Sequence, residues 1–197
     1  MEVILASASP RRRDILSSLG VTFRVRPANV DETVDTHLPP WEICTLLSKR
    51  KADSVVSEVG GSFLVIASDT IVWKNGRVFG KPSDRNEAHA MLSELSGSVH
   101  SVYSGVALCL DGKCAVGYDH ADVTFKKLTP REIGYYIDNY PPYDKAGAYG
   151  IQDFASLFAE KISGDYLSII GFPLFRASEL LKDNFGMDFI DLTENRR

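Results

Sequence analysis

Short apolar segments alternate with amphipathic helical patterns along the chain, and this alternation restricts the fold more than any other feature. Residues 3–6 and 63–67 are predicted to be buried strands because they are short and continuously apolar. Val99–Leu110 and residues 114–125 are longer strand patterns, joined by the hairpin dipeptide Asp111-Gly112. Helices between strands, combined with a hairpin, predict an α/β fold with a mixed, partly antiparallel sheet.

Helix starts are marked by capping residues. Ser9 followed by Pro10 predicts an N-cap and a first helical residue, and Thr129-Pro130-Arg131-Glu132 predicts a capping box. Pro40 is predicted to begin a second helix, which we expect to be buried through Ile43, Leu46, Leu47, Val55 and Val56. The remaining predictions are a strand at 22–25, a hairpin turning at Asn75-Gly76, a helix at 87–95, a strand at 157–162 and a final helix at 173–181.

Composition is that of an ordinary globular protein, with 197 residues, 44% hydrophobic and 24% charged. We therefore expect residues 1–197 to form one domain, with two lobes that share one core. The net charge of −4 argues against a nucleic-acid polymer as partner, although a small anionic ligand could still bind local positive groups. No apolar run reaches the roughly 18 residues that a membrane helix needs, so we expect no membrane contact and a cytoplasmic location.

The three cysteines, Cys44, Cys109 and Cys114, lack CxxC spacing. They are predicted to be buried, reduced thiols in a reducing compartment, and Cys109 is expected in a strand core rather than as a nucleophile. The sequence also contains no Walker motif, no GxGxxG after a strand, no HExxH and no GxSxG, and its four histidines lack metal-ligand spacing.

Three arginines, Arg11, Arg12 and Arg13, occupy the first turn of the helix that Ser9 is predicted to cap. Cations are disfavoured at a helix N-terminus, which carries partial positive charge. An anion bound among them would explain their position, because backbone N–H groups and guanidinium groups both bind phosphate. We therefore predict a phosphate site that includes Ser9; the alternative is a solvated basic face.

Asp69 lies two residues beyond the predicted strand at 63–67, and ligands of α/β sheets gather beyond the carboxyl ends of strands. A carboxylate there can hold a divalent metal or orient a water molecule for attack. The alternative interpretation is a residue that caps a turn.

Two further lysines and one loop could neutralise a phosphate chain. Lys81 lies in a rigid loop between Gly80 and Pro82, whereas the residue type of Lys51, on the second helix, favours an ordinary surface lysine. The loop at 144–152 contains Lys145 together with glycines that permit close backbone approach, although without further context such a loop is more often an ordinary connection.

Four separated motifs in this order, ILASASPRRRDILSSLG, ASDTIV, GKP and DKAGAYGIQ, resemble those of the Maf family, the septum-formation inhibitor-like proteins. The resemblance extends over residues 4–173. It implies an inosine-triphosphatase-like fold, in which an elongated, bent mixed sheet is flanked by helices and two lobes enclose a central cleft. It also implies hydrolysis of nucleoside triphosphates to the monophosphate and pyrophosphate, with Mg²⁺ or Mn²⁺.

The resemblance assigns roles to particular residues. Asp69 resembles the base that activates water at the α-phosphate and would also contact the metal, with Glu32 as an additional acidic group near that metal. The residues that resemble phosphate-binding positions are Ser7, Arg11, Arg12, Lys51 and Lys81. The positions that resemble the specificity residues of the dTTP/UTP-hydrolysing branch are Arg12, Thr70 and Gln152.

The expected substrates are accordingly dTTP, UTP and modified forms such as 5-methyl-UTP, in a house-cleaning role, and the family resemblance implies a homodimer. Two alternatives stay open. One is a nucleotide-binding regulator of septum formation and cell division that needs no hydrolysis. The other is a sequence-nonspecific nucleic-acid binder, which the acidic balance disfavours.

Overall fold

The computed structural model describes residues 1–35 and 37–193 as a mixed arrangement of strands and helices. The strands are β1 Glu2–Leu5, β2 Phe23–Val25, β3 Phe63–Lys74, β4 Arg77–Phe79, β5 Val99–Leu110, β6 Lys113–Phe125 and β7 Ala159–Gly164. The α-helices are α1 Pro10–Ser18, α2 Pro40–Glu58, α3 Arg85–Leu95, α4 Pro130–Asn139, α5 Tyr166–Ile170 and α6 Leu174–Phe185. Two 3₁₀ turns, η1 Ala146–Ala148 and η2 Phe154–Leu157, lie between α4 and β7.

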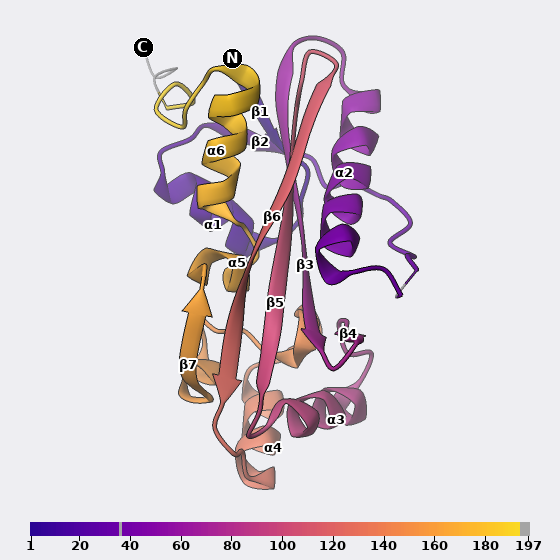
Figure 1. The fold of residues 1–197 in the computed structure, drawn as a ribbon, viewed down its shortest axis with the longest axis vertical. Helices are drawn as coiled ribbons and strands as arrows, with labels where there is room; N and C mark the ends of the chain where they lie inside the picture. Colours follow the sequence, from indigo (N-terminus) through magenta and orange to yellow (C-terminus); the bar gives the residue numbers. More distant parts are fainter. Residues whose placement is uncertain (36, 194–197) are drawn as a thin grey trace. The chain divides into compact units, whose positions relative to one another are not determined.

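The strands form one hydrogen-bonded sheet of mixed direction. Its order is β2-β1-β3-β5-β6-β7, with β4 paired to β3. Strand β1 runs parallel to β2 and β3, whereas the β3–β4 and β6–β7 pairs are antiparallel. The predicted α/β class with a mixed sheet flanked by helices is therefore confirmed (Figure 1).

The chain divides into two compact units. The first contains residues 1–69 and 104–119 and the chain from residue 171 onward, and the second contains residues 70–103 and 120–170. The prediction of a single domain over the whole chain stays a prediction.

In the first unit, helices cover both faces of the strands (Figure 1). Ala52 and Val55 of α2 pack in one core cluster with Val65 of β3 and with residues of β1 and β5. The opposite face carries α6, because Gly117 of β6 lies against its Leu180. Side chains along a strand alternate between the two faces of a sheet. The Cys114 side chain lies on the α2 face, so position 117, an odd number of residues further along β6, faces the other side.

The second unit contains the hairpin at the end of β3, the β6–β7 pair and the packed helices α3 and α4. Both predicted local signals are present there. Asn75 and Gly76 adopt positive φ values of 50° and 78° in the hairpin turn, and Thr129 and Glu132 form the reciprocal capping box at the start of α4.

Three predictions were wrong. Strand β3 does not end before Asp69 but continues to Lys74, because its second half pairs with β4. Val56 is exposed, because it lines an open cavity beside the strands rather than the closed core. Cys109 and Cys114 are not reduced thiols but form a disulfide, and Cys114 is exposed. Helix α5 was not predicted.

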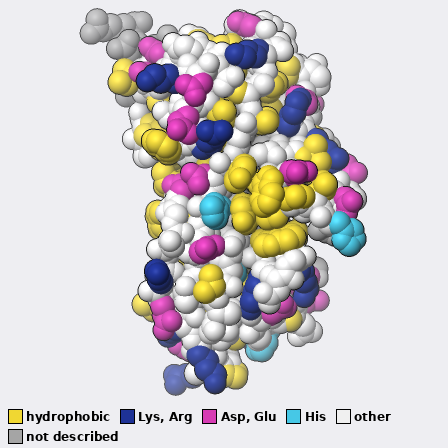
Figure 2. Space-filling model, viewed as in Figure 1, with side chains coloured by type: hydrophobic (Ala, Val, Ile, Leu, Met, Phe, Trp, Pro, Cys, Tyr) yellow, Lys and Arg dark blue, Asp and Glu magenta, His cyan; other side chains and the backbone are white. Residues whose placement is uncertain are grey.

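Exposed hydrophobic side chains gather near the start of α2 in the first unit (Figure 2). The Trp41 ring stacks on Tyr118 at a centroid distance of 6.3 Å, and Val116 is also exposed on β6. Within the described residues, no helix combines the length and the apolar character that crossing a membrane would require.

Candidate active site

Helix α1 begins where the sequence predicts, with Ser9 as N-cap and Pro10 as first helical residue, but the Ser9 side chain accepts no capping hydrogen bond. Instead, Ser7 Oγ accepts hydrogen bonds from the Ser9 backbone N–H at 3.2 Å and from Arg12 Nη1 at 3.0 Å. Arg12 Nε also donates to the Gly171 carbonyl at 2.8 Å. These contacts fix the Arg12 guanidinium at the start of the helix.

Two carboxylates meet one ammonium group in the first unit. Lys51 Nζ lies 2.5 Å from Asp69 Oδ1 and 2.8 Å from Glu32 Oε1. Lys51 and Asp69 are both buried, at 8% and 7% exposed, whereas Glu32 is exposed. The structure therefore brings together residues that lie far apart in the sequence and that were predicted separately.

Close packing of α2 on β5 places Lys51 at the sheet. A Cβ atom at Gly105 would lie 2.3 Å from the Cys44 carbonyl oxygen, so the helix backbone contacts the strand directly. Lys51 is seven residues, about two helical turns, beyond Cys44 and therefore faces the same way. Only glycine at position 105 permits this approach, which lets the Lys51 side chain reach Asp69.

Burial and neighbouring charges act in opposite directions on Asp69. Burial raises the pKa of the Asp69 carboxyl above its ordinary value, while the positive charges of Lys51 and Arg12 oppose that rise. Burial also lowers the pKa of the Arg12 guanidinium, opposed mainly by the Asp69 charge. Lys51 and Arg12 therefore both stabilise the negative charge of the buried Asp69 carboxylate.

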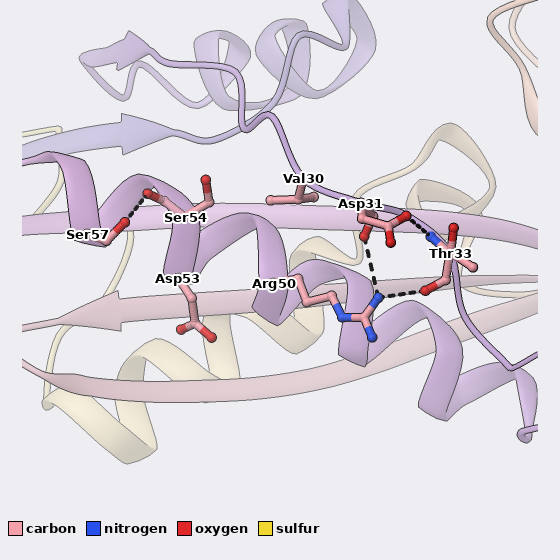
Figure 3. Close-up of a pocket in the computed structure, with 7 residues that line it drawn as sticks. All are labelled: Val30, Asp31, Thr33, Arg50, Asp53, Ser54 and Ser57. Atoms are coloured by element: carbon pink, nitrogen blue, oxygen red, sulfur yellow. Dashed lines mark hydrogen bonds between the residues drawn. The ribbon is translucent and has the colours of Figure 1, made fainter.

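Arg50 of α2 holds the segment that carries Glu32 (Figure 3). Arg50 Nη1 donates to the Thr33 carbonyl at 2.7 Å and to the Asp31 carbonyl at 3.4 Å. The Thr33 N–H in turn donates to Asp31 Oδ1 at 2.8 Å. These residues line an open pocket of about 570 Å³, together with Val30, Asp53, Ser54 and Ser57.

Strand β3 is also anchored beside Asp69. Ser68 Oγ, which is buried, lies 2.7 Å from the Gly105 carbonyl oxygen and 2.9 Å from that of Gly171. The Gly171 carbonyl therefore contacts both Ser68 and Arg12. Sequence reasoning missed Ser68, Gly171 and Arg50, because none belongs to a motif whose spacing signals a role.

The carboxylates have the chemistry of a divalent-cation site. Oxygen atoms of Asp69 and Glu32 contact the same nitrogen, so they are close enough to share one cation, and carboxylate oxygens are preferred ligands of Mg²⁺ and Mn²⁺. The described residues thus fit the metal that the family resemblance implies.

The remaining predicted residues have separate positions. Arg11 is half-buried and Arg13 exposed on α1. In the second unit, Gly147 N donates to the Gly80 carbonyl at 3.0 Å, so the loop before Lys81 and the loop after Lys145 lie side by side. Lys81 and Gln152 are exposed, Thr70 is half-buried, and Lys145 Nζ contacts Asp144 Oδ1 at 2.7 Å.

Cys44 lies near Asp69 and is the only one of the three cysteines without a disulfide. Burial, and secondarily the Asp69 charge, raises the pKa of its thiol to about 12, so the reactive thiolate is scarce. We expect the unreduced native protein to show almost no reaction with Ellman's reagent, and one thiol per chain to react after unfolding in guanidinium. Three reactive thiols after unfolding would contradict the disulfide.

The chain is similar to several known proteins. The family model described as "Maf-like protein" matches residues 2–184. A relative from Alkaliphilus oremlandii (strain OhILAs), named "dTTP/UTP pyrophosphatase", is 44% identical and covers 96% of this chain and 99% of its own. A relative of the same name from Pelotomaculum thermopropionicum (strain DSM 13744 / JCM 10971 / SI) gives the same values. Among solved structures, a HAM1 protein from Coxiella burnetii has a TM-score of 0.44 at 15% identity, covering 80% of this chain and 91% of that chain. The chain belongs to the Maf family.

Proposed function

We propose that this protein is a nucleoside triphosphate pyrophosphatase that hydrolyses dTTP and UTP to the monophosphate and pyrophosphate. Its relatives of that name match it over nearly their full length. The observation that carries the proposal is the contact of Lys51 with both Asp69 and Glu32 next to a fixed Arg12. Two cations and two carboxylates in one place are the groups that phosphoryl chemistry uses.

Asp69 is the proposed base. It accepts a proton from water as the water oxygen bonds to the α-phosphorus, and the bond from that phosphorus to the bridging oxygen breaks, releasing pyrophosphate. The raised pKa of this buried carboxyl makes it a stronger base than an ordinary aspartate. Because Lys51 Nζ contacts Asp69 Oδ1, water must approach the carboxylate on the side that Lys51 leaves open.

The cations at the start of α1 are proposed to bind the phosphates. Arg12 is already fixed by Ser7 and Gly171, so little side-chain freedom is lost when its guanidinium group binds an anion. Ser9 and Arg11 flank it, and Lys51 adds a second charge. Phosphate contacts for Lys81 and Lys145 stay predictions from the sequence.

Asp69 and Glu32 are the proposed ligands of Mg²⁺ or Mn²⁺. A bound divalent ion would polarise phosphate oxygens and neutralise charge that develops on them. In the structure the Lys51 ammonium lies between these carboxylates and holds them together. Lys51 therefore holds the acidic pair together, and its ammonium group would have to move aside when the ion binds between them.

Base preference is proposed to depend on Arg12, Thr70 and Gln152. The Gln152 side chain is exposed and offers both an amide donor and an amide acceptor, which match the edge of a uracil or thymine ring. Modified pyrimidine nucleotides such as 5-methyl-UTP keep that edge and are expected substrates.

A homodimer and a cytoplasmic location complete the proposal. The exposed cluster of Trp41, Val116 and Tyr118 supports self-association, because solvent-exposed aromatic groups are common at subunit interfaces. Light scattering coupled to size-exclusion chromatography measures the assembled mass, and a monomer at micromolar concentration would contradict the dimer.

The test of the function is a substrate screen with purified protein. Canonical and modified triphosphates are incubated with Mg²⁺ or Mn²⁺, and pyrophosphate and monophosphate are both quantified. We expect dTTP and UTP to give the two products in equal amounts, with little turnover of ATP or GTP. Release of inorganic phosphate from the terminal position, or no turnover with any triphosphate, would contradict the proposal.

Replacing Arg50 with glutamine tests whether the Arg50 hydrogen bonds to the Glu32 segment help to position Glu32. Loss of its bonds to Asp31 and Thr33 loosens the segment that presents Glu32, so the Mg²⁺ concentration for half-maximal rate should rise about 3- to 10-fold. The turnover at saturating Mg²⁺ should change less. Lys49→Gln is the matched control, because this neighbour pairs with Asp53 and not with the segment. An unchanged Mg²⁺ requirement in the Arg50 variant would show that these hydrogen bonds have no effect on metal binding.

A further inference from the structure

A second cluster of metal-ligating side chains includes neither Asp69 nor Glu32 of the candidate active site. Asp53, Cys109 and Cys114 each offer a ligand atom, and these atoms all lie within 4.8 Å of one another. Cys114 Sγ is 3.9 Å from Asp53 Oδ1. All three residues belong to the first unit, with Asp53 on α2 and the cysteines on β5 and β6.

The hairpin geometry fixes the two cysteines as neighbours. Asp111 and Gly112, with φ values of 49° and 80°, form the two-residue turn between β5 and β6. Cys109 and Cys114 therefore face each other across the strands, with their Cα atoms 4.1 Å apart, and they form a disulfide. Tertiary packing of α2 then brings Asp53 to the same place.

The cluster opens onto a cavity. A cavity of about 280 Å³ is lined by Asp53 and both cysteines, together with apolar residues that include Val56, Val59, Phe63 and Val65. Cys114 and Asp53 are exposed, whereas Cys109 is buried. A small ion or a thiol reagent can therefore reach the sulfur of Cys114.

A purely stabilising role explains the disulfide poorly. The cysteines are five residues apart in sequence, and a disulfide that closes so short a loop restricts the unfolded chain least. Cross-linking also adds little order to strands that the hairpin turn already pairs. The placement of a carboxylate beside the two sulfurs has no part in such a role.

We propose that the reduced protein binds a thiophilic divalent cation, Zn²⁺, through Cys109, Cys114 and Asp53, and that the disulfide is the form unable to bind it. Two thiolates and a carboxylate are ligands that Zn²⁺ accepts in tetrahedral geometry, with the fourth position left for water. Two thiolates on one such ion lie about 3.8 Å apart. Rotation about the Cα–Cβ bonds can provide that separation.

The redox step balances with a dithiol as reductant. The dithiol gives two electrons and two protons to the Cys109–Cys114 bond and becomes a cyclic disulfide, while the protein gains two thiols. Binding of Zn²⁺ then displaces both thiol protons, so affinity rises with pH. Lys49, which pairs with Asp53 at 2.6 Å, must move aside, and this exposed pair is held weakly.

The experiment uses Co²⁺ as a spectroscopic substitute for Zn²⁺. Full-length protein is reduced with a dithiol, desalted without oxygen and titrated with Co²⁺. We expect a thiolate-to-cobalt charge-transfer band and a tetrahedral visible band that saturate at one ion per chain, and their loss on addition of Zn²⁺. The same protein left oxidised should show neither band, which provides a comparison without any substitution.

Variants then assign the ligands. With Cys114→Ser, the thiolate-to-cobalt band should no longer saturate at one Co²⁺ ion per chain. Asp53→Asn should weaken Co²⁺ binding at least about tenfold. Cys44→Ser is the matched control and should bind as wild type, because Cys44 is buried elsewhere on α2. Circular dichroism confirms that each variant is folded. The proposal is overturned if reduced wild-type protein gives no thiolate band, if oxidised protein binds equally well, or if Asp53→Asn leaves the affinity unchanged.

Discussion

Asp69→Asn is expected to reduce pyrophosphate release from dTTP about 10²- to 10⁴-fold, the usual contribution of a general base. Asparagine keeps the shape of the side chain but cannot accept the proton from water. Its effect on kcat should exceed its effect on KM, because Arg12 and Lys51 remain to bind the phosphates. Initial rates over a range of dTTP concentrations at saturating Mg²⁺ measure both parameters.

The variant should remain folded, so that a lost rate reports on chemistry. Lys51 Nζ keeps its contact with Glu32 Oε1, and the replaced carboxylate is one whose charge is disfavoured by burial. Asp183→Asn, at an exposed position on α6, is the control and should retain wild-type turnover. If Asp69→Asn kept more than a tenth of the rate, Asp69 would not be the base.

The same substitution separates catalysis from a regulatory role. A protein that acts on cell division only by binding nucleotide should keep its effect when Asp69 is asparagine, because the phosphate-binding cations are intact. Loss of the effect together with the turnover would support hydrolysis as its cause. The comparison requires matched expression of the two proteins in a strain that lacks the chromosomal copy.

Local features of the fold could be predicted from the sequence, because each depends on residues close together in the chain. Ser9-Pro10 gave the start of α1, Asp111-Gly112 the β5–β6 turn, and Thr129 with Glu132 a capping box. The chemical identity of Asp69 and Lys51 as candidates also came from the sequence. Their direct contact could not, because it depends on how closely α2 packs against Gly105.

The errors have the same origin in long-range structure. β3 appeared to end before Asp69 because Ser68 and Thr70 are polar, yet β4 pairs with its second half. Asp69 instead lies just beyond Ile66, the last β3 residue paired with β1. Cys109 and Cys114 lack a recognised spacing, so only the register of the hairpin shows that they can bond.

Acid is expected to destabilise the protein through His100, in the second unit. Its ring is 2% exposed, Nε2 lies 2.8 Å from Tyr149 Oη, and within the described structure Nδ1 has no hydrogen-bond partner. Burial, reinforced by the Lys74 charge and opposed by Asp122, lowers the pKa of His100 to about 4. An unfolded chain protonates its histidines near pH 6.5.

The sign follows from which state binds the proton. Between pH 6.5 and about 4, His100 is protonated in the unfolded chain but stays neutral in the folded protein. The free energy of unfolding therefore falls as the pH falls. The full effect is about 3 kcal/mol, and most of it is lost between pH 6.5 and pH 4. Urea unfolding at a series of pH values measures this slope.

His100→Gln isolates this contribution from the carboxylates that also titrate in acid. Glutamine is neutral throughout and can still hydrogen-bond the Tyr149 hydroxyl, so the difference in unfolding free energy between wild type and variant should shrink from pH 7 to pH 4. Parallel curves for wild type and His100→Gln would mean that His100 protonates equally easily in the folded and unfolded protein, which its burial against Phe125 and Tyr149 opposes.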